Sequence, residues 1–301
     1  GEALVGGVLL GASTSLSGTL VSLSAALDGR ASLAFSNGIG GIAAQTAFLA
    51  VADIVHRRAN LEHAAAELAN VFQGAVLMLL LALPLLALTG PDVTLLGVHP
   101  VSVMLLVVYV GGLIAVRRVR ETPMWQPVDT NETEPDIPDE DGRDRAATLL
   151  LFGKFAILLV FLGAAGWLLS QIAAELIDRY ALRASVVGAL MTAVATSLPE
   201  LVTTVAAVRR GALQLALGGI IGGNTFDVLF LTLADAAYRD GSIYHAVGMD
   251  DYFWLSTGLV MTAVLTLGLL YREKQGPGNI GLESAALLLI YAGAIAVQVL
   301  G

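Results

Sequence analysis

Two acidic residues lie inside long apolar stretches of the sequence. Glu200 is part of the segment A-T-S-L-P-E-L, and Asp227 closes the segment G-G-N-T-F-D. Burying an ionisable side chain in a long apolar stretch is costly, so each of these residues predicts a functional site. Pairing with a base is the structural alternative, but neither stretch contains a Lys or Arg near its carboxylate.

The residues before Glu200 add oxygen ligands of other kinds. Pro199 has no N–H and clashes with the carbonyl four residues back, so we expect it to free the carbonyl oxygen of Ala195. The hydroxyls of Thr196 and Ser197 follow directly in the sequence. Carboxylates, carbonyls and hydroxyls are hard oxygen ligands that suit Na⁺ and Ca²⁺ better than zinc or copper. The spacing therefore predicts a cation site whose charged ligands are the two carboxylates.

The composition indicates which elements must position these groups. Of the 301 residues, 56% are hydrophobic and 14% are charged, and the mean hydropathy is +0.78. Soluble domains carry about 25% charged residues, so a soluble enzyme, a disordered chain and a coiled coil are excluded. A helix needs about 20 apolar residues to cross a bilayer, whereas membrane β-strands alternate apolar and polar residues. We predict an all-α polytopic membrane protein with nine helices in this chain. These helices cover residues 3–27, 31–54, 70–89, 97–116, 147–171, 182–208, 212–237, 252–271 and 279–300.

Several classes of function are excluded by what the sequence lacks. The net charge of −9 disfavours a nucleic-acid partner, because phosphate binding requires a basic surface. Without Cys there is no thiolate nucleophile and no zinc–thiolate site. The sequence has no P-loop, nucleophile elbow or H-E-x-x-H motif. We therefore expect no enzyme activity and no cofactor, and the expected partners are inorganic cations and the lipid bilayer.

The basic residues predict the orientation of the chain. Eleven Arg and Lys residues fall in the loops on one side of the predicted helices and four on the other. The positive-inside rule makes the first side cytoplasmic, in a cell-membrane protein. The acidic, Pro-rich segment 117–146 lacks the spacing of a calcium loop and is predicted to be a solvated cytoplasmic linker between halves 1–116 and 147–301. Asp53 and Asp235, at helix ends, are expected to be solvated at the interface.

An internal repeat relates the two halves. A shift of 182 positions aligns residues 8–53 with 190–235 without a gap and gives 14 identical pairs in 46. Chance would give about four or five in a sequence of this composition. The two copies start on opposite sides of the membrane, and such inverted repeats are typical of secondary transporters with a site near the midplane. The counterpart of helix 147–171 would precede Gly1, so we expect ten helices in a five-plus-five arrangement.

The two acidic segments resemble the α-repeat of the sodium/calcium exchanger family, within the cation/calcium exchanger superfamily. That repeat reads G-T-S-x-P-E and then G-S-N-x-x-N or G-S-N-x-x-D, and this sequence has T-S-L-P-E-L and G-G-N-T-F-D. The resemblance covers nearly the whole chain, including two halves joined by a loop. It implies that Glu200 and Asp227 are cation ligands and that Thr196, Ser197 and Asn224 complete the shell.

The first copy of the repeat departs from the family pattern. Gly18 stands where the family has its first Glu, Ser17 replaces Pro, and Ile42 replaces Asn. The predicted site therefore carries at most two negative charges, both from the second copy. That charge balances one Ca²⁺, two monovalent ions, or one Na⁺ and one proton. Binding several Na⁺ ions at once is disfavoured, because each additional cation would be uncompensated at low dielectric.

Some polar residues of the first copy are retained. The resemblance implies that Thr14 and Ser15 contribute hydroxyls, that Asn37 supplies an upstream Asn, and that Gln45 stands in place of Asn or Asp. We expect these four residues to belong to the cation-binding set. For the stripe of hydroxyls that includes Ser15, hydrogen bonding between helices is an equal alternative.

Taken with the resemblance, these features predict a secondary antiporter that exchanges Ca²⁺, or a related cation, for Na⁺ by alternating access. Ca²⁺ and Na⁺ are then transported ions rather than cofactors. One alternative keeps the fold and couples cation exchange to protons, with Glu200 alternating between protonated and cation-bound states. A second alternative, prompted by Gly18, is a transport-inactive membrane subunit that senses ions.

Overall fold

The computed structural model describes residue 11 and residues 13–56, 59–65, 67–133, 145–276 and 280–300, with the backbone alone for 145–149. The described residues form helices and connecting loops, and their one strand-like pairing is a bridge between Leu95 and Val98. The all-α prediction is confirmed for this part of the chain. Residues 3–10 and 12 of the predicted first span, and residues 134–144 of the acidic segment, lie outside the described residues.

The helices follow one another in chain order and most are apolar. Seven of them are long and apolar enough to cross a membrane, and the bent pair α8–α10 makes an eighth. The shorter α2 corresponds to the described end of the predicted first span. The helices are α2 (Leu16–Leu27), α3 (Ala31–His56), α4 (Leu61–Ala64), α5 (Leu68–Thr89), α6 (Pro100–Glu121), α7 (Arg145–Tyr180), α8 (Ala184–Val186), the π-helical turn η1 (Val187–Thr192), α9 (Ala193–Thr196), α10 (Leu198–Arg209), α11 (Leu213–Asp227), α12 (Leu229–Ala237), α13 (Ile243–Ala246), α14 (Met249–Tyr271) and α15 (Leu282–Leu300).

Two of the predicted spans are interrupted. The span predicted at 182–208 is broken at Ser197, where α9 ends and α10 begins at an angle of 42°. Pro199, in the first turn of α10, explains this break because it cannot donate the helical hydrogen bond. The span predicted at 212–237 is divided at Val228 into α11 and α12. Discontinuous helices are where transporters bind ions near the midplane.

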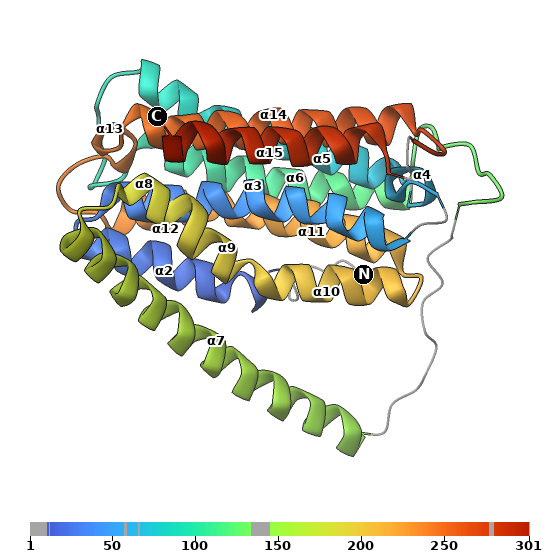
Figure 1. Cartoon of the computed structure of the whole chain (residues 1–301), viewed down its shortest axis with the longest axis horizontal. Coiled ribbons are helices and arrows are strands. Elements are labelled where there is room, and N and C mark those ends of the chain that lie inside the picture. The colour runs from blue at the N-terminus through green and yellow to red at the C-terminus, as the bar shows by residue number, and fades with distance from the viewer. Residues whose placement is uncertain are drawn as a thin grey trace.

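The repeat extends through the whole of each half. The bounds of α2 and α10, and those of α4 and α13, are both offset by 182 positions. The same offset separates the starts of α6 and α15 and the ends of α5 and α14. Figure 1 places α4 and α13 at opposite ends of the bundle, as an inverted repeat requires. The repeat thus reaches well beyond the segments aligned by sequence.

Asp53 and Asp235 cap the starts of neighbouring helices. The two side chains are 1% and 0% exposed, so the expectation that both would be solvated is wrong. Each carboxylate accepts two backbone N–H groups from the starts of other helices, which satisfies donors that a helix leaves unpaired. The donors, at 2.7–3.1 Å, are Leu61 and Gly281 for Asp53, and Ile243 and His99 for Asp235, again related by the 182-residue offset.

Glu62 lies fully buried next to the Asp53 cap. Burial, and then the charges of Asp53 and Glu283, raise the pKa of Glu62 well above its ordinary value of 4.5. The folded chain therefore binds a proton there that the unfolded chain releases, and stability falls as the pH rises above about 4.5. We expect Glu62→Gln to raise the melting temperature at pH 7–9 by a few degrees, and the gain to vanish near pH 4. Thermal unfolding from pH 4 to pH 9 measures this difference in melting temperature. A difference that does not change with pH would contradict the raised pKa of Glu62.

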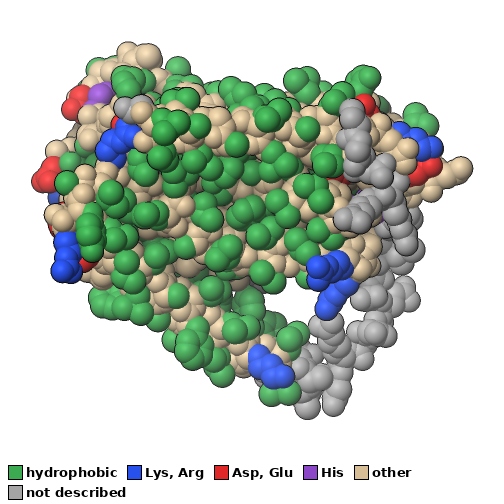
Figure 2. Space-filling model, in the orientation of Figure 1, with side chains coloured by type: hydrophobic (Ala, Val, Ile, Leu, Met, Phe, Trp, Pro, Cys, Tyr) green, Lys and Arg blue, Asp and Glu red, His purple; other side chains and the backbone are tan. Residues whose placement is uncertain are grey.

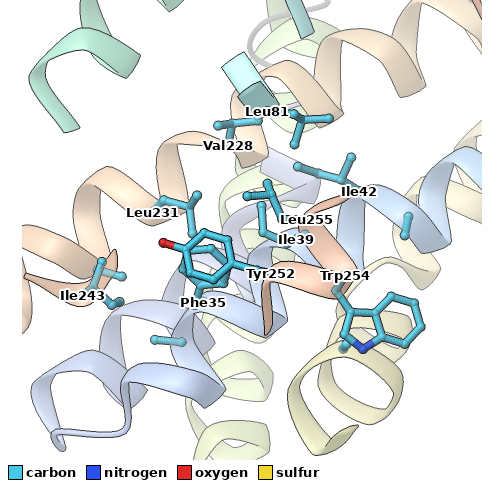
Figure 3. Close-up of a cluster of buried hydrophobic side chains, with 14 of the residues drawn as sticks. Phe35, Ile39, Ile42, Leu81, Val228, Leu231, Ile243, Tyr252, Trp254 and Leu255 are labelled. Carbon is cyan, nitrogen blue, oxygen red and sulfur yellow. The ribbon is translucent and has the colours of Figure 1, made fainter. Parts of the chain in front are cut away.

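The core lies around α3, which contacts most of the other helices. Figure 3 shows Phe35, Ile39 and Ile42 of α3 facing Leu231 of α12 and Tyr252 of α14. Small residues along α3 and its neighbours permit this close approach, as in other membrane helix packing. The discontinuous helices are consequently held against the centre of the bundle.

The outside of the bundle is apolar between two charged ends. Figure 2 shows hydrophobic side chains over the middle of one face, with most of the Asp, Glu, Lys and Arg side chains at the two ends. The long helix α7 contacts α2 and η1, and its first half diverges from the bundle (Figure 1). This distribution fits a protein surrounded by lipid.

The segment predicted as a linker, 117–146, begins as helix. α6 continues to Glu121, supported by an ion pair of Arg117 with Glu121. Further along, Glu132 pairs with Lys274 at 2.7 Å, which lowers the pKa of the Glu132 carboxyl. Part of the predicted linker therefore packs against the end of α14.

Candidate cation site

Both breaks in the discontinuous helices bring a carboxylate into the centre of the bundle. Glu200 lies in the first turn of α10 and is 5% exposed, and Asp227 is the last residue of α11 and is 2% exposed. The two carboxyls are close enough for their charges to interact. The structure brings the two predicted carboxyls together, and their binding of a cation stays a prediction.

Hydroxyl groups of the first repeat face Glu200. The side chains of Thr14 and Ser15, at the start of α2, both interact with the Glu200 carboxyl, and Ser15 also interacts with Asp227. Neither oxygen of Glu200 has a hydrogen bond of standard geometry within the described part of the chain, and neither does Ser15 Oγ. The two hydroxyls therefore lie near the carboxylate oxygens, and the Thr14 hydroxyl also donates to the Gly11 carbonyl at 3.1 Å.

Gln45 of α3 contacts Asp227, the residue to which the 182-residue offset relates it. Gln45 Nε2 donates to Asp227 Oδ2 at 2.7 Å and to Ser197 Oγ at 3.3 Å. A Cβ at Gly41 or Gly223 would lie 3.9 Å from Gln45 Nε2 or 3.5 Å from its Oε1, so both glycines border this amide. The pairing orients the amide and leaves Asp227 Oδ1 and Gln45 Oε1 without partners among the described residues.

Replacing Gln45 tests this pairing. We expect Gln45→Leu to lower the stability of the cation-free protein by about 1–3 kcal/mol, because it removes a donor from a buried carboxylate. Adding Ca²⁺ or Na⁺ should recover part of this loss, since a cation replaces the missing donor. Thermal unfolding in detergent with and without the cation measures both effects. An unchanged melting temperature in cation-free buffer would contradict the assigned role.

Asn224 lies one turn before Asp227. Its Nδ2 donates to Thr46 Oγ1 at 3.0 Å, while its Oδ1 is buried without a partner in the described structure. Thr46 in turn donates to the carbonyl of Ile42. The amide is thus fixed with its oxygen unused.

Six buried oxygens in this region have no hydrogen-bond partner among the residues that the structure describes. They are Ser15 Oγ, Gln45 Oε1, both carboxyl oxygens of Glu200, Asn224 Oδ1 and Asp227 Oδ1. Unpaired buried polar atoms are costly and usually mark a missing partner. No basic side chain of the described chain contributes to the electrostatic environment of either carboxyl. The arrangement therefore suits a cation held by hard oxygen ligands.

Among the described residues, Glu200 and Asp227 are the two carboxylates that the structure places together at this centre. No group of three His, Asp or Glu side chains among the described residues is arranged to hold a metal ion. A cation between Glu200 and Asp227 would therefore complete its shell with neutral oxygens, such as hydroxyls and amides.

Three of the predicted site residues are engaged elsewhere or point away. Both ends of the Asn37 amide are hydrogen-bonded, to the Gly18 carbonyl, Ser22 and Thr192, so Asn37 joins α2, α3 and η1. Thr196 Oγ1 donates to the Ala193 carbonyl at 3.2 Å. Ala195 is exposed, whereas Thr196 and Ser197 are buried.

The sequence analysis missed two aromatic neighbours of Asp227. Tyr109 of α6 lies within electrostatic range of Asp227 and stacks edge-on with Phe226 at 6.2 Å. Phe230 lies one turn after Asp227 and is 3% exposed. The 182-residue offset relates Phe48 to Phe230 within the aligned segments, and extending the alignment would have revealed the pair Tyr109 and Tyr291.

Comparison with known proteins identifies relatives of this arrangement. Residues 150–300 match the family model described as sodium/calcium exchanger protein. The inner membrane protein YrbG of Escherichia coli (strain K12) is 29% identical over 150 residues, which are 50% of this chain and 43% of YrbG. The sodium/calcium exchanger MaX1 of Methanosarcina acetivorans is 47% identical over 93 residues, 31% of this chain and 27% of MaX1. The matches thus span less than half the length of these relatives.

A solved structure resembles the whole fold. The sodium-calcium exchanger NCX_Mj, soaked with 10 mM Na⁺ and zero Ca²⁺, matches with a TM-score of 0.61 and 18% identity, over 97% of this chain and 86% of the other. At this identity the likeness shows the fold. The overall arrangement of helices is therefore common to both chains.

Proposed function

The chain belongs to the sodium/calcium exchanger protein family, and on that premise we propose that it is a secondary active cation antiporter. It moves Ca²⁺, or a related cation, across the membrane in exchange for Na⁺. The sequence similarity to the sodium/calcium exchanger MaX1 and the fold shared with NCX_Mj support this assignment. The ions are cargo and not resident cofactors.

The observation that carries the proposal is the set of six buried oxygens near the two breaks that have no hydrogen-bond partner among the described residues. Glu200 and Asp227 supply the charge that balances a cation, and Ser15, Gln45 and Asn224 supply neutral oxygens. Without a cation, two carboxylates lie in a low-dielectric interior with no base beside them, which is unfavourable. Thr14 and Ser197 border the cation, and the hydrogen bonds of Asn37 and Thr196 hold the discontinuous helices in position.

Exchange follows from competition for these ligands. Ca²⁺ and Na⁺ both prefer oxygen ligands, so one ion must leave before the other can bind the same carboxylates. The symmetry-related helices α2 and α10 flank the site, and rocking of this pair against the rest of the bundle opens it to either side. The loops rich in Arg, including the segment 117–146, then lie on the cytoplasmic side of the cell membrane.

Reconstitution tests the proposal. The purified chain in Na⁺-loaded proteoliposomes is expected to take up ⁴⁵Ca²⁺ when Na⁺ is diluted outside. Uptake driven by a pH gradient and indifferent to Na⁺ would instead favour proton-coupled exchange. Binding of ⁴⁵Ca²⁺ without flux under either gradient would refute antiport and favour an ion-sensing subunit.

A further inference from the structure

Gly18 occupies the repeat position of Glu200, and the space beside it is filled by an aromatic ring. The two residues are related by the 182-residue offset that relates α2 to α10. A Cβ built on Gly18 would lie 2.9 Å from Cε2 and 3.4 Å from Cζ of Phe230, and 3.5 Å from Thr196 Oγ1. A contact below 3.0 Å forces a neighbour to move, so a side chain at position 18 would require the Phe230 ring to shift.

Phe230 is wedged between the two repeats. Its side chain is 3% exposed, it stacks edge-on with Phe226 at 6.2 Å, and a Cβ at Gly38 would lie 3.3 Å from Phe230 Cβ. The Phe230 side chain therefore lies against α2 at Gly18 and against α3 at Gly38, and Thr196 of α9 also borders the Cβ position of Gly18. These elements surround the place that is the symmetry mate of the Glu200 carboxyl.

The repeat equivalent of Phe230 behaves differently. Phe48 is related to Phe230 by the same offset, but it is only half-buried. The repeat that pairs with the Glu200 carboxylate therefore has a Phe, Phe48, that is not fully buried. Where the repeat has Gly18, the equivalent Phe fills the space.

We propose that Phe230 determines the ion stoichiometry by occupying the symmetry-related subsite, so that the centre holds no more than two positive charges. This inference rests on the proposed function. An aromatic ring offers no oxygen ligand and no charge, so an additional cation would be uncompensated in a low-dielectric interior. The cycle then exchanges one Ca²⁺ for two Na⁺ and moves no net charge.

The test compares Gly18→Glu/Phe230→Ala with the wild type and with Phe230→Ala alone. Displacement of ⁴⁵Ca²⁺ by Na⁺ is measured on purified protein in detergent, because a Hill coefficient cannot exceed the number of sites. We expect a coefficient of about 2 or less for the wild type and for Phe230→Ala. The double variant gains a carboxylate and the space for it, and its coefficient should exceed that of the wild type. Phe48→Ala is the matched control and should leave the wild-type value unchanged.

Electrical measurement of the wild type provides a test that needs no variant. Proteoliposomes containing the wild-type protein should exchange Na⁺ for ⁴⁵Ca²⁺ at a rate independent of an imposed membrane potential. An exchange rate that depends on the membrane potential would overturn the inference. An exchange ratio of three Na⁺ per Ca²⁺ would do so as well. So would a folded double variant with the wild-type coefficient. A wild-type protein that binds no cation would overturn the proposed function itself, and this inference with it.

Discussion

Glu200→Gln is expected to abolish cation binding and exchange. The substitution keeps the size of the side chain and removes one of the two charges that balance the bound cation. Losing one member of a buried charge pair costs roughly 3–5 kcal/mol, which corresponds to a fall in affinity of about 100-fold or more. Equilibrium binding of ⁴⁵Ca²⁺ to purified protein and ⁴⁵Ca²⁺ uptake into Na⁺-loaded proteoliposomes measure the effect.

A stability measurement separates this effect from misfolding. In cation-free buffer Glu200→Gln should be at least as stable as the wild type, because it removes a buried charge that has no partner in the described structure. The wild type should gain stability when Ca²⁺ is added and the variant should not. Glu175→Gln, on the exposed face of α7, is the control and should behave as the wild type. Undiminished exchange by Glu200→Gln would refute the proposed role of this carboxylate.

Gly40→Ala is expected to prevent α3 from packing against the discontinuous helix. A Cβ on Gly40 would lie 2.4 Å from Ala189 Cα and 2.7 Å from its carbonyl oxygen. These are backbone atoms of the π-helical turn η1, so no rotamer change relieves the clash. Overpacking of a core costs about 1–3 kcal/mol or more, and here two central helices would have to separate. The variant should show a lower melting temperature and a reduced yield of monodisperse protein in detergent.

Gly219→Ala provides the matched control. Gly219 lies on α11, and a Cβ there would meet open space. Because Ala favours a helix over Gly by about 1 kcal/mol, this variant should be as stable as the wild type or slightly more so. Equal stability of the Gly40 and Gly219 variants would show that the close approach of α3 and η1 does not hold the fold.

The sequence alone determined the class of protein, the repeat and the two carboxylates. Hydropathy is a property of consecutive residues, so the apolar spans can be read without knowing how helices pack. The 182-residue offset follows from alignment, and Glu200 and Asp227 stand out because charge is rare in such spans. Pro199 also marked the first helix break, since its lost N–H is a local effect.

Tertiary structure alone decided how the polar groups are used. Gln45 contacts Asp227 because the symmetry axis brings equivalent positions together, and Asn37 is satisfied by α2 and η1. Asp53 looked like a solvated helix end, but its neighbours fold over it and use it as a cap. Phe230 fills the space beside Gly18, which no spacing rule reveals. Whether a donor is already paired, or a space already filled, depends on residues distant in sequence, so only the packed structure could decide it.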